Sequence, residues 1–260
     1  MNKKGLIGIV VVIVLLVVVI LLLIGLISVG LLVPTGKIIG GLDDDSVSGP
    51  QGKVVMGSKI FDISDFDSVK LVGNFNLFLT DSDSFDVKIT ADSDVFDKLE
   101  VRQQGKTLVI ERNRYTFLSK KIDVFLTMPE LKDLEVLGSG DIVSENTLTG
   151  DDLKISILGS GKSNVNIKYN TLFSNIAGSG TLTYSGDVKD HEIKISGSGN
   201  IKAFDLISEN TNIGISGSGN SDVNVNDELD ITISGSGNVK YKGNPKVKQS
   251  VSGFGNIEQV

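Results

Sequence analysis

The residues that could carry out catalysis are few in this sequence, and their spacing matches no standard catalytic arrangement. The chain has a single histidine, His191, which stands between Asp190 and Glu192. An imidazole beside a carboxylate is the usual pair for general acid–base catalysis, but a lone histidine in a charged run is more often a surface loop residue. The chain has no cysteine, so thiolate nucleophiles, thiolate metal ligands and disulfides are excluded.

Polysaccharide cleavage, a common activity of β-helical proteins, needs paired carboxylates or a carboxylate-bound metal ion next to a basic group. The acidic residues of the C-terminal half are instead scattered, at Asp141, Asp187, Asp190, Asp205, Asp222, Asp227 and Asp230. We therefore expect no enzymatic activity, no catalytic residue and no cofactor. A polysaccharide-active β-helix enzyme is kept as the alternative.

Two acidic segments resemble calcium-binding loops in composition only. An EF-hand loop that began at Asp81 would need Gly at its sixth position and Glu at its twelfth, but Asp86 and Asp92 occupy them. A hairpin turn accounts better for residues 81–86, and a solvated linker accounts better for the triplet Asp43-Asp44-Asp45. The sequence therefore predicts no metal site.

The elements that would position these residues follow from a tripeptide repeat in the second half of the chain. Gly-Ser-Gly occurs six times, a seventh copy has Phe254 in place of serine, and successive copies start 18 to 21 residues apart. The glycines are Gly138, Gly140, Gly159, Gly161, Gly178, Gly180, Gly197, Gly199, Gly217, Gly219, Gly235, Gly237, Gly253 and Gly255. A phosphate-binding glycine loop would occur once, before a helix. Repeats of about 20 residues separated by strand-forming residues are instead typical of a parallel β-helix or β-solenoid.

The residues that flank each copy form columns of like type. The position two places before the first glycine is always Val or Ile, and the position four places before it is mostly apolar. Because alternate side chains share one face of a strand, both columns are expected to face the interior of a stack of rungs. The position after the second glycine is Asn in the last four copies. We expect the Ser and Asn columns to form hydrogen-bonded ladders, and the glycines to turn the corners between strands.

Residues 59–131 lack the repeat but alternate apolar and polar residues, so they are predicted to form a non-repetitive β region before the solenoid of residues 132–260. Apolar residues alternate from Val69 to Leu79, and a hairpin is predicted at Gln104-Gly105.

The N-terminal segment predicts one transmembrane helix before this all-β body. Residues 6–33 contain no charged side chain, and about 20 apolar residues suffice to cross a bilayer. The segment is longer than the apolar part of a cleaved signal peptide, so a retained signal anchor is predicted, with pilin-like cleavage after Gly5 as the alternative. By the positive-inside rule, Lys3 and Lys4 place residues 1–5 in the cytoplasm. Residues 34–58, rich in Gly, Ser, Asp and Pro, are predicted to be a flexible linker to an extracytoplasmic body.

The body is acidic. Lys3 and Lys4 are the only charges before residue 34, so the rest of the chain carries the net charge of −7 less those two, or −9. Nucleic-acid binding needs clustered Lys and Arg, so no nucleic-acid partner is expected.

Several motifs follow one another along residues 59–260. They are Phe66-Asp67-Ser68-Val69, Gly105-x-Thr107-Leu108-x-Ile110, Met128-Pro129-Glu130-Leu131, the serial Gly-Ser-Gly-Asn units and the closing Tyr241-x-Gly243-Asn244-Pro245. Together they resemble the head GIN domain family, whose members are labelled auto-transporter adhesins. The resemblance implies one β-helical domain that follows a signal or membrane anchor and has no established enzymatic activity. Phe254 and the absence of Asn from the first three copies depart from the pattern.

These observations predict a single-pass, membrane-anchored cell-surface protein, either an adhesin or an envelope structural element. The expected partners are the membrane, through residues 6–33, and a polysaccharide or surface protein bound by Ser, Asn and Thr side chains. Envelope sensing is a further alternative, and it would need a partner within the membrane. No cap is predicted after the last rung, so the C-terminal rung is expected to stack on a second copy or to be blunted by Glu258.

Overall fold

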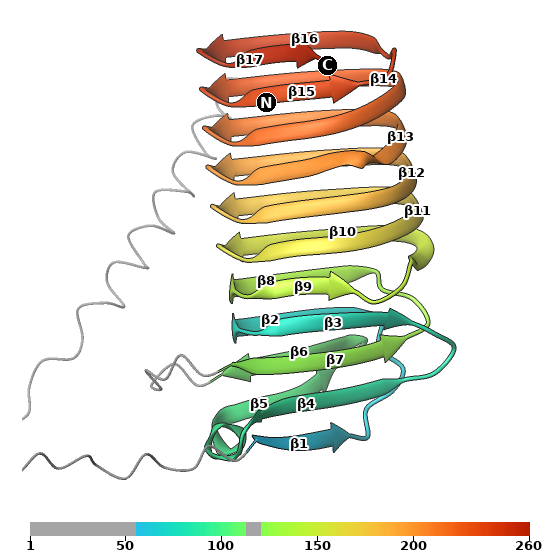
Figure 1. Ribbon diagram of the computed structural model, residues 1–260, viewed down its shortest axis with the longest axis vertical. Helices are drawn as coiled ribbons and strands as arrows, with labels where there is room; N and C mark the ends of the chain where they lie inside the picture. Colours follow the sequence, from blue (N-terminus) through green and yellow to red (C-terminus); the bar gives the residue numbers. More distant parts are fainter. Residues whose placement is uncertain (1–55, 113–120) are drawn as a thin grey trace, which may run out of the picture. The chain divides into compact units, whose positions relative to one another are not determined.

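The computed structural model describes residues 56–112 and 121–260, which are built almost entirely of β-strands (Figure 1). The N-terminal strands are β1 (Met56–Phe61), β2 (Ser68–Asn74), β3 (Asn76–Asp81), β4 (Asp86–Asp92), β5 (Leu99–Gln104), β6 (Thr107–Arg112) and β7 (Ile122–Met128). The repeat region forms β8 (Asp133–Ser139), β9 (Asp141–Ser144), β10 (Leu148–Gly159), β11 (Lys162–Gly178), β12 (Thr181–Gly197), β13 (Asn200–Gly217), β14 (Asn220–Gly235), β15 (Asn238–Lys242), β16 (Lys246–Gly253) and β17 (Asn256–Gln259). A 3-10 helix, η1 (Ser93–Lys98), follows β4. The predicted all-β solenoid is confirmed.

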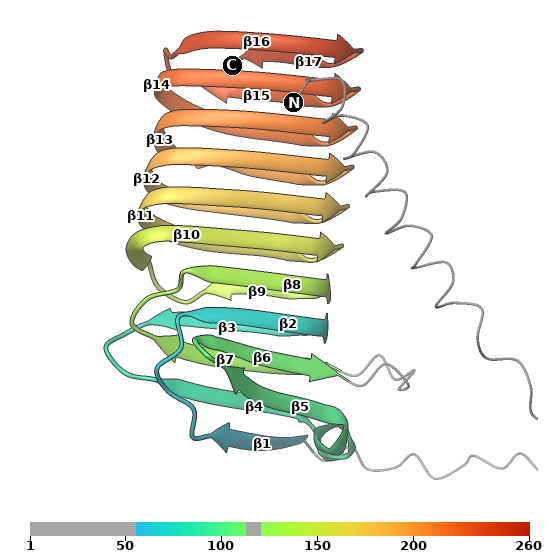
Figure 2. The same cartoon turned by 180° about the vertical axis from the view of Figure 1, so that it is seen from behind.

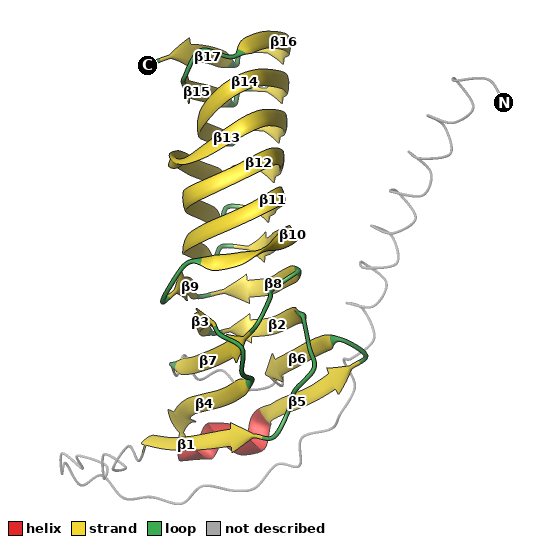
Figure 3. Ribbon diagram, turned by 90° about the vertical axis from the view of Figure 1, so that its right-hand side faces the viewer, coloured by secondary structure: helices red, strands yellow, loops and turns green. Residues whose placement is uncertain are grey.

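Each Gly-Ser-Gly copy is a corner between two sheets. A long strand such as β12 leaves one corner, crosses the first sheet, bends at the opposite edge and returns through the second sheet to the next corner (Figure 3). We call the first the post-corner sheet; it contains β3, β7, β9, β15, β17 and the first halves of β11–β14. The pre-corner sheet contains β2, β6, β8, β16 and the second halves of β10–β14. Neighbouring rungs pair in parallel, so Gly178 lies beside Gly197 and like residues form columns.

The N-terminal region contributes two further rungs to the same stack, which corrects its prediction as a non-repetitive part. β2 lies between β6 and β8, and β3 lies between β7 and β9, all in parallel pairs (Figure 1). The rung β2–β3 is therefore inserted between two rungs that follow it in sequence. Its corner is Gly73-Asn74-Phe75, where Gly73 and Asn74 lie beside Gly138 and Ser139. Because this corner lacks the Gly-Ser-Gly signature, a search for the tripeptide does not find it.

Antiparallel strands close the N-terminal end of the stack (Figure 2). β5 and β6 form the hairpin predicted at Gln104-Gly105, where Gly105 has a φ of 61°. The hairpin predicted at residues 81–86 is wrong, because β7 pairs with both β3 and β4 and lies between them. The same turn residues serve a crossing loop equally well. β1 starts at Met56, so residues 56–58 of the predicted linker belong to a strand.

The interior between the two sheets is a continuous apolar core. The column two places before each corner is at most 2 % exposed in the first six copies, from Val136 to Ile233. Burying each of these side chains contributes about 1.5–3 kcal/mol. The inward direction predicted for this column is therefore confirmed. In the last rung the same column holds Val251, which is 42 % exposed.

The predicted membrane segment, residues 6–33, lies outside the described residues, as does most of the predicted linker. Within residues 56–112 and 121–260, no helix combines the length and the apolar character needed to cross a bilayer.

Candidate functional site

The glycines predicted as turns all lie at the corners, and the two glycines of a copy fill different roles. Gly217, a first glycine, has a φ of 126°, and a Cβ on it would lie 2.5 Å from the carbonyl oxygen of Gly197. Gly219, a second glycine, needs no positive φ, but a Cβ on it would lie 2.5 Å from Cγ2 of Ile195. Gly217 is thus required by backbone geometry and Gly219 by close packing between rungs, whereas Gly140, also a second glycine, itself has a φ of 125°.

The two predicted ladders have different outcomes. The Asn220 carboxamide donates to Asn200 and accepts from Asn238, both at 2.9 Å, so the asparagine ladder is formed. The serine ladder is not formed, because no hydrogen bond joins two corner hydroxyls among the described residues. The serine backbone instead binds the next rung, and the Ser218 N–H donates to the Gly197 carbonyl at 2.8 Å.

The motifs that carry the family resemblance meet where the chain inserts its out-of-order rung. The N–H groups of Asp67 and Ser68 donate to the Lys106 carbonyl at 3.0 and 3.1 Å, and the Lys132 N–H donates to the Asp67 carbonyl at 2.7 Å. Three segments that are distant in sequence are joined at this point. These motifs therefore hold the rung order, which is a structural role.

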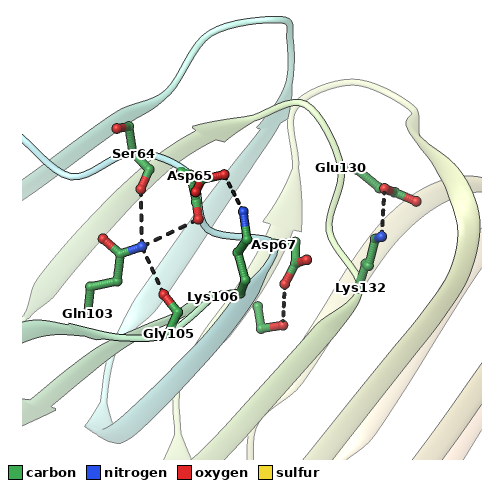
Figure 4. A network of polar contacts seen from close by, with 9 residues as sticks. Ser64, Asp65, Asp67, Gln103, Gly105, Lys106, Glu130 and Lys132 are labelled. Carbon is green, nitrogen blue, oxygen red and sulfur yellow. Dashed lines mark hydrogen bonds and ion pairs between the residues drawn. The ribbon is translucent and has the colours of Figure 1, made fainter.

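Side chains reinforce the same junction (Figure 4). The Gln103 amide donates to the carbonyls of Ser64 and Gly105 at 3.1 and 3.0 Å, and Lys106 pairs with Asp65. Asp65 has a φ of 62°, a conformation that a non-glycine residue keeps only where its surroundings hold it. The hairpin β5–β6 thereby clamps the loop before β2.

Asp81, considered above for calcium, fastens a loop instead. One carboxylate oxygen of Asp81 accepts from the Thr149 N–H at 2.7 Å and from its hydroxyl at 2.9 Å. The Asn146 side chain bonds the Asp81 backbone at both its N–H and its carbonyl. The loop between β9 and β10 is therefore tied to the end of β3.

His191 is a buried strand residue, which corrects its prediction as a surface loop residue. It lies in β12 and is 3 % exposed, because it shares the inward phase of Ile193 and Ile195. The Ser174 hydroxyl lies 2.9 Å from His191 Nε2 and donates to the Tyr184 hydroxyl at 2.9 Å. The rings of Tyr184 and His191 meet edge to face with centroids 5.8 Å apart.

This serine–histidine contact has the residue types of a nucleophile and its base, but the one Ser174 proton is donated to Tyr184 and the contact is closed to substrate. Ser174 and Tyr184 are 0 % and 1 % exposed. Burial lowers the pKa of His191 to about 3, so the imidazole stays neutral at physiological pH. Burial also raises the pKa of Tyr184 well above its usual value. Each of the three side chains has a hydrogen-bond partner within this buried cluster.

An outward-facing aromatic pair was not predicted. Phe78 and Phe125 occupy outward positions in strands whose neighbouring residues are buried. An aromatic residue at an outward position of the alternating pattern is the sequence feature that predicts such a pair. Their rings stack with centroids 4.8 Å apart, and Lys88 Nζ lies 5.3 Å from the Phe125 centroid. Rings stacked between adjacent strands turn their edges to solvent, and Lys88 covers one end of the stack. The pair stabilises strand pairing.

Two polar columns run side by side along the outer surface of the post-corner sheet. The asparagine column is Asn200, Asn220, Asn238 and Asn256, and the charged column is Lys202, Asp222, Lys240 and Glu258. A groove of about 420 Å³ lies between them, lined by members of both columns and by Phe204. We call it the asparagine groove.

The charged column leaves its central carboxylate unpaired. Among the described residues, Asp222 lies within 4.0 Å of neither Lys202 nor Lys240, although it is in register with both. Partial burial raises the pKa of Asp222, and the two ammonium groups offset only part of that shift. Lys240 contacts Glu258 at 3.9 Å. The groove thus presents one carboxylate, that of Asp222, which has no direct ion-pair partner among the described residues.

A β-bulge shapes one wall of the groove. Ala203 of β13 pairs with Val223 of β14, but the next paired residue is Ile207, so residues 204–206 are extra relative to β14. Further along, β14 has one extra residue between Val225 and Glu228, so the net excess of two residues accounts for the longer interval in this rung, 20 residues against 18 in the next. Phe204 stands on the bulge, and Lys242 Nζ lies 4.6 Å from its ring centroid. Bulges often redirect a side chain beside a binding site.

The outer surface of the pre-corner sheet is more acidic. Asp190, Glu192, Glu228 and Asp230 line a depression of about 330 Å³ together with Asn210 and Asn212. In the part of the chain that the structure describes, no three His, Cys, Asp or Glu side chains are arranged to hold a metal ion. This surface is therefore a solvated charged face.

These features define the class of the protein: a two-sheet β-solenoid that presents polar columns on flat outer faces. The chain belongs to the family described as "Putative auto-transporter adhesin, head GIN domain", which matches residues 65–245. The resemblance seen in the sequence motifs is thereby confirmed.

Solved structures share this fold. A "putative adhesin" from Bacteroides fragilis NCTC 9343 superposes with a TM-score of 0.76 at 24 % identity, covering 79 % of this chain and 97 % of that one. A "putative adhesin" from Parabacteroides merdae ATCC 43184 gives a TM-score of 0.61 at 27 % identity, covering 80 % and 98 %. A "Putative lipid binding protein" from Parabacteroides distasonis ATCC 8503 gives 0.63 at 26 % identity, covering 79 % and 96 %. Comparison with the curated proteins found no match.

Proposed function

We propose that this chain is a membrane-anchored, non-catalytic adhesin of the cell surface that binds through the outer face of its post-corner sheet. The observation that carries the proposal is the asparagine groove between two polar columns. The family description and the names of the similar structures support a surface-binding role. The uncharged segment 6–33 supports anchoring, and Lys3 and Lys4 support an extracytoplasmic body.

The absence of catalysis in this proposal rests on burial. The Ser174–His191 contact, which is the arrangement most like a catalytic pair among the described residues, is sealed inside the core. The acidic side chains that reach solvent near it, such as Asp190 and Glu192, lie on the outer surface of the pre-corner sheet. A substrate at that surface would not reach the Ser174 hydroxyl, which is 0 % exposed, and this supports a non-catalytic role.

The proposal is tested on cells that produce the full chain. Protease added to intact cells should cleave the body, and the cells should adhere to immobilised cell-envelope material more strongly than cells without the chain. Cleavage only after lysis would contradict the surface location. Equal adhesion of both cell types would contradict the adhesin function.

A second candidate function, an envelope structural element that assembles by self-stacking, is favoured by the last rung. β16 is exposed along its whole length, and Val247 and Val251, which continue interior columns, are 38 % and 42 % exposed. Within residues 56–112 and 121–260, no further strand pairs with the outer edges of β16 and β17. An unpaired edge with exposed apolar side chains favours pairing with a second copy.

The stacking candidate predicts that Val251→Lys abolishes concentration-dependent association in light scattering. Ile207→Lys is the matched control, because Ile207 is 45 % exposed but lies at the bend opposite the corners. Equal association of both variants, or a monomer at every concentration, would remove this candidate.

A further inference from the structure

The asparagine groove presents hydrogen-bonding groups of both kinds at each rung. A carboxamide has two N–H donors and an oxygen with two lone pairs. Asn220 uses one N–H and one lone pair in the ladder, which leaves one donor and one acceptor for a ligand. Hydroxyl and acetamido groups also donate and accept. The column therefore complements a polyhydroxylated ligand, whose groups would pair in either sense.

The charges around the groove select against a strongly charged ligand. Lys202 and Lys240 alternate with Asp222 and Glu258 along the column, so the positive and negative charges cancel. The chain as a whole is acidic, with a net charge of −7, which disfavours the approach of a polyanion. A polycation would lie beside two ammonium groups as well as two carboxylates, so the column gives it no net attraction. A neutral ligand needs no net attraction and still binds the free Asp222 carboxylate.

The repeat of these groups matches a polymer. The asparagine column occupies four successive strands, from β13 to β17, and strands lie about 4.8 Å apart. This spacing is close to the rise per residue of an extended polysaccharide, so equivalent groups of successive sugars meet equivalent groups of successive rungs. Phe204, which stands on the bulge with Lys242 Nζ 4.6 Å from its ring centroid, also lines the groove.

From these observations we propose that the asparagine groove binds an extended, neutral polysaccharide that runs along the stack of rungs. The inference rests on the proposed adhesin function and names its ligand class. Asn200, Asn220 and Asn238 bind successive sugars, and Asp222 accepts hydrogen bonds from their hydroxyl groups.

The test measures oligosaccharide binding by the full chain in lauryldimethylamine oxide micelles, a detergent without sugar groups. The probes are cellohexaose, chitohexaose and mannohexaose as neutral chains, hexagalacturonate as a polyanion, and cellobiose as a short neutral chain. Calorimetry should show that at least one neutral hexamer binds at least about tenfold more tightly than cellobiose and hexagalacturonate. Failure of all three neutral hexamers, or preference for hexagalacturonate, would overturn the inference.

Variants locate the site. Asn220→Ala and Asp222→Asn should each weaken hexamer binding about tenfold. Asn212→Ala should leave it unchanged, because Asn212 is an exposed asparagine on the pre-corner sheet. Thermal unfolding of each variant verifies the fold, and the nearly isosteric Asp222→Asn variant keeps the test valid if Asn220→Ala is unstable. Equal loss in all three variants would place binding elsewhere.

The experiments distinguish failure of the proposed adhesin function from failure of the proposed polysaccharide ligand. If no neutral hexamer binds but cells producing the chain still adhere, the ligand class is wrong and the adhesin function stands. If a neutral hexamer binds in the groove but the cells do not adhere, the adhesin function is wrong and the site stands.

Discussion

At the scale of single residues, the core contains a polar cluster that is stable only because its members satisfy one another. Ser174, Tyr184 and His191 are each at most 3 % exposed. A buried polar group without a partner costs about 1–3 kcal/mol, so each of the three depends on the others. The neutral imidazole is the form that fits, since a buried charge would have no counter-ion in this contact.

Acid should therefore destabilise the fold through His191. Its pKa is lowered to about 3 in the folded chain, against about 6.5 when unfolded, so below pH 6.5 the unfolded state binds the extra proton. The free energy of unfolding is therefore unaffected by protonation of His191 above that pH. It should fall by about 2 kcal/mol from pH 6.5 to pH 5. Urea denaturation across this range measures it.

His191→Gln is the control for the acid effect. Because the chain has no other histidine, this variant should show little pH dependence between pH 6.5 and pH 5. An unchanged pH dependence in His191→Gln would show that another group is responsible.

At the scale of elements, the corner is the unit that converts the repeat into a stack. In the fifth copy, Gly217 allows the chain to turn, and Gly219 allows the preceding rung to approach closely. The carbonyl of Gly197 accepts from Ser218 N–H, so the turn is also a hydrogen-bonded link between rungs. A side chain at either glycine would separate two rungs, not only strain one residue.

Gly217→Ala should lower the free energy of unfolding by at least about 2 kcal/mol, because Ala must adopt positive φ and its Cβ meets the Gly197 carbonyl. Gly214→Ala, in the same strand, is the matched control. A Cβ on Gly214 would have only the Ile193 carbonyl, at 3.8 Å, within contact distance. This control should stabilise the chain by about 0.5–1 kcal/mol. Similar effects of the two variants in chemical denaturation would refute the role assigned to the corner.

At the scale of the whole described molecule, the two ends of the stack differ. The N-terminal end is closed by antiparallel β4, β5 and β1, and the inserted rung β2–β3 ties distant segments together. At the other end, β16 has no buried residue. In a solenoid each rung is stabilised mainly by its neighbours, so a rung with one neighbour is the least stable.

Hydrogen exchange of the full chain at low concentration should therefore be fastest, among the solenoid strands, in β16 and β17 and slowest in β11–β13. Mass spectrometry of peptides from these strands measures the difference. Protection of β16 that rises with protein concentration would support self-stacking. Equal protection of β16–β17 and of β11–β13 would contradict the assignment of β16–β17 as the least stable rung.

The sequence by itself determined the features that depend on local chemistry. Glycine at the corners, β-branched residues two places before them and Asn after them specify a rung from nearest neighbours in the chain. The burial of His191 could also be predicted from the sequence, since this residue stands two places before Ile193 in the inward phase. The charged neighbours Asp190 and Glu192 instead led to the wrong prediction of a surface position for His191.

Only the tertiary structure decided which rungs lie side by side. Strand pairing is non-local, so nothing near β2 or β3 in the sequence states that β6–β7 lies below them and β8–β9 above. The asparagine groove likewise depends on the register of four strands and on a bulge at Phe204, which alternation alone cannot locate. The repeat specified the rung, and the packing of rungs on one another made the surface that we propose to bind a polysaccharide.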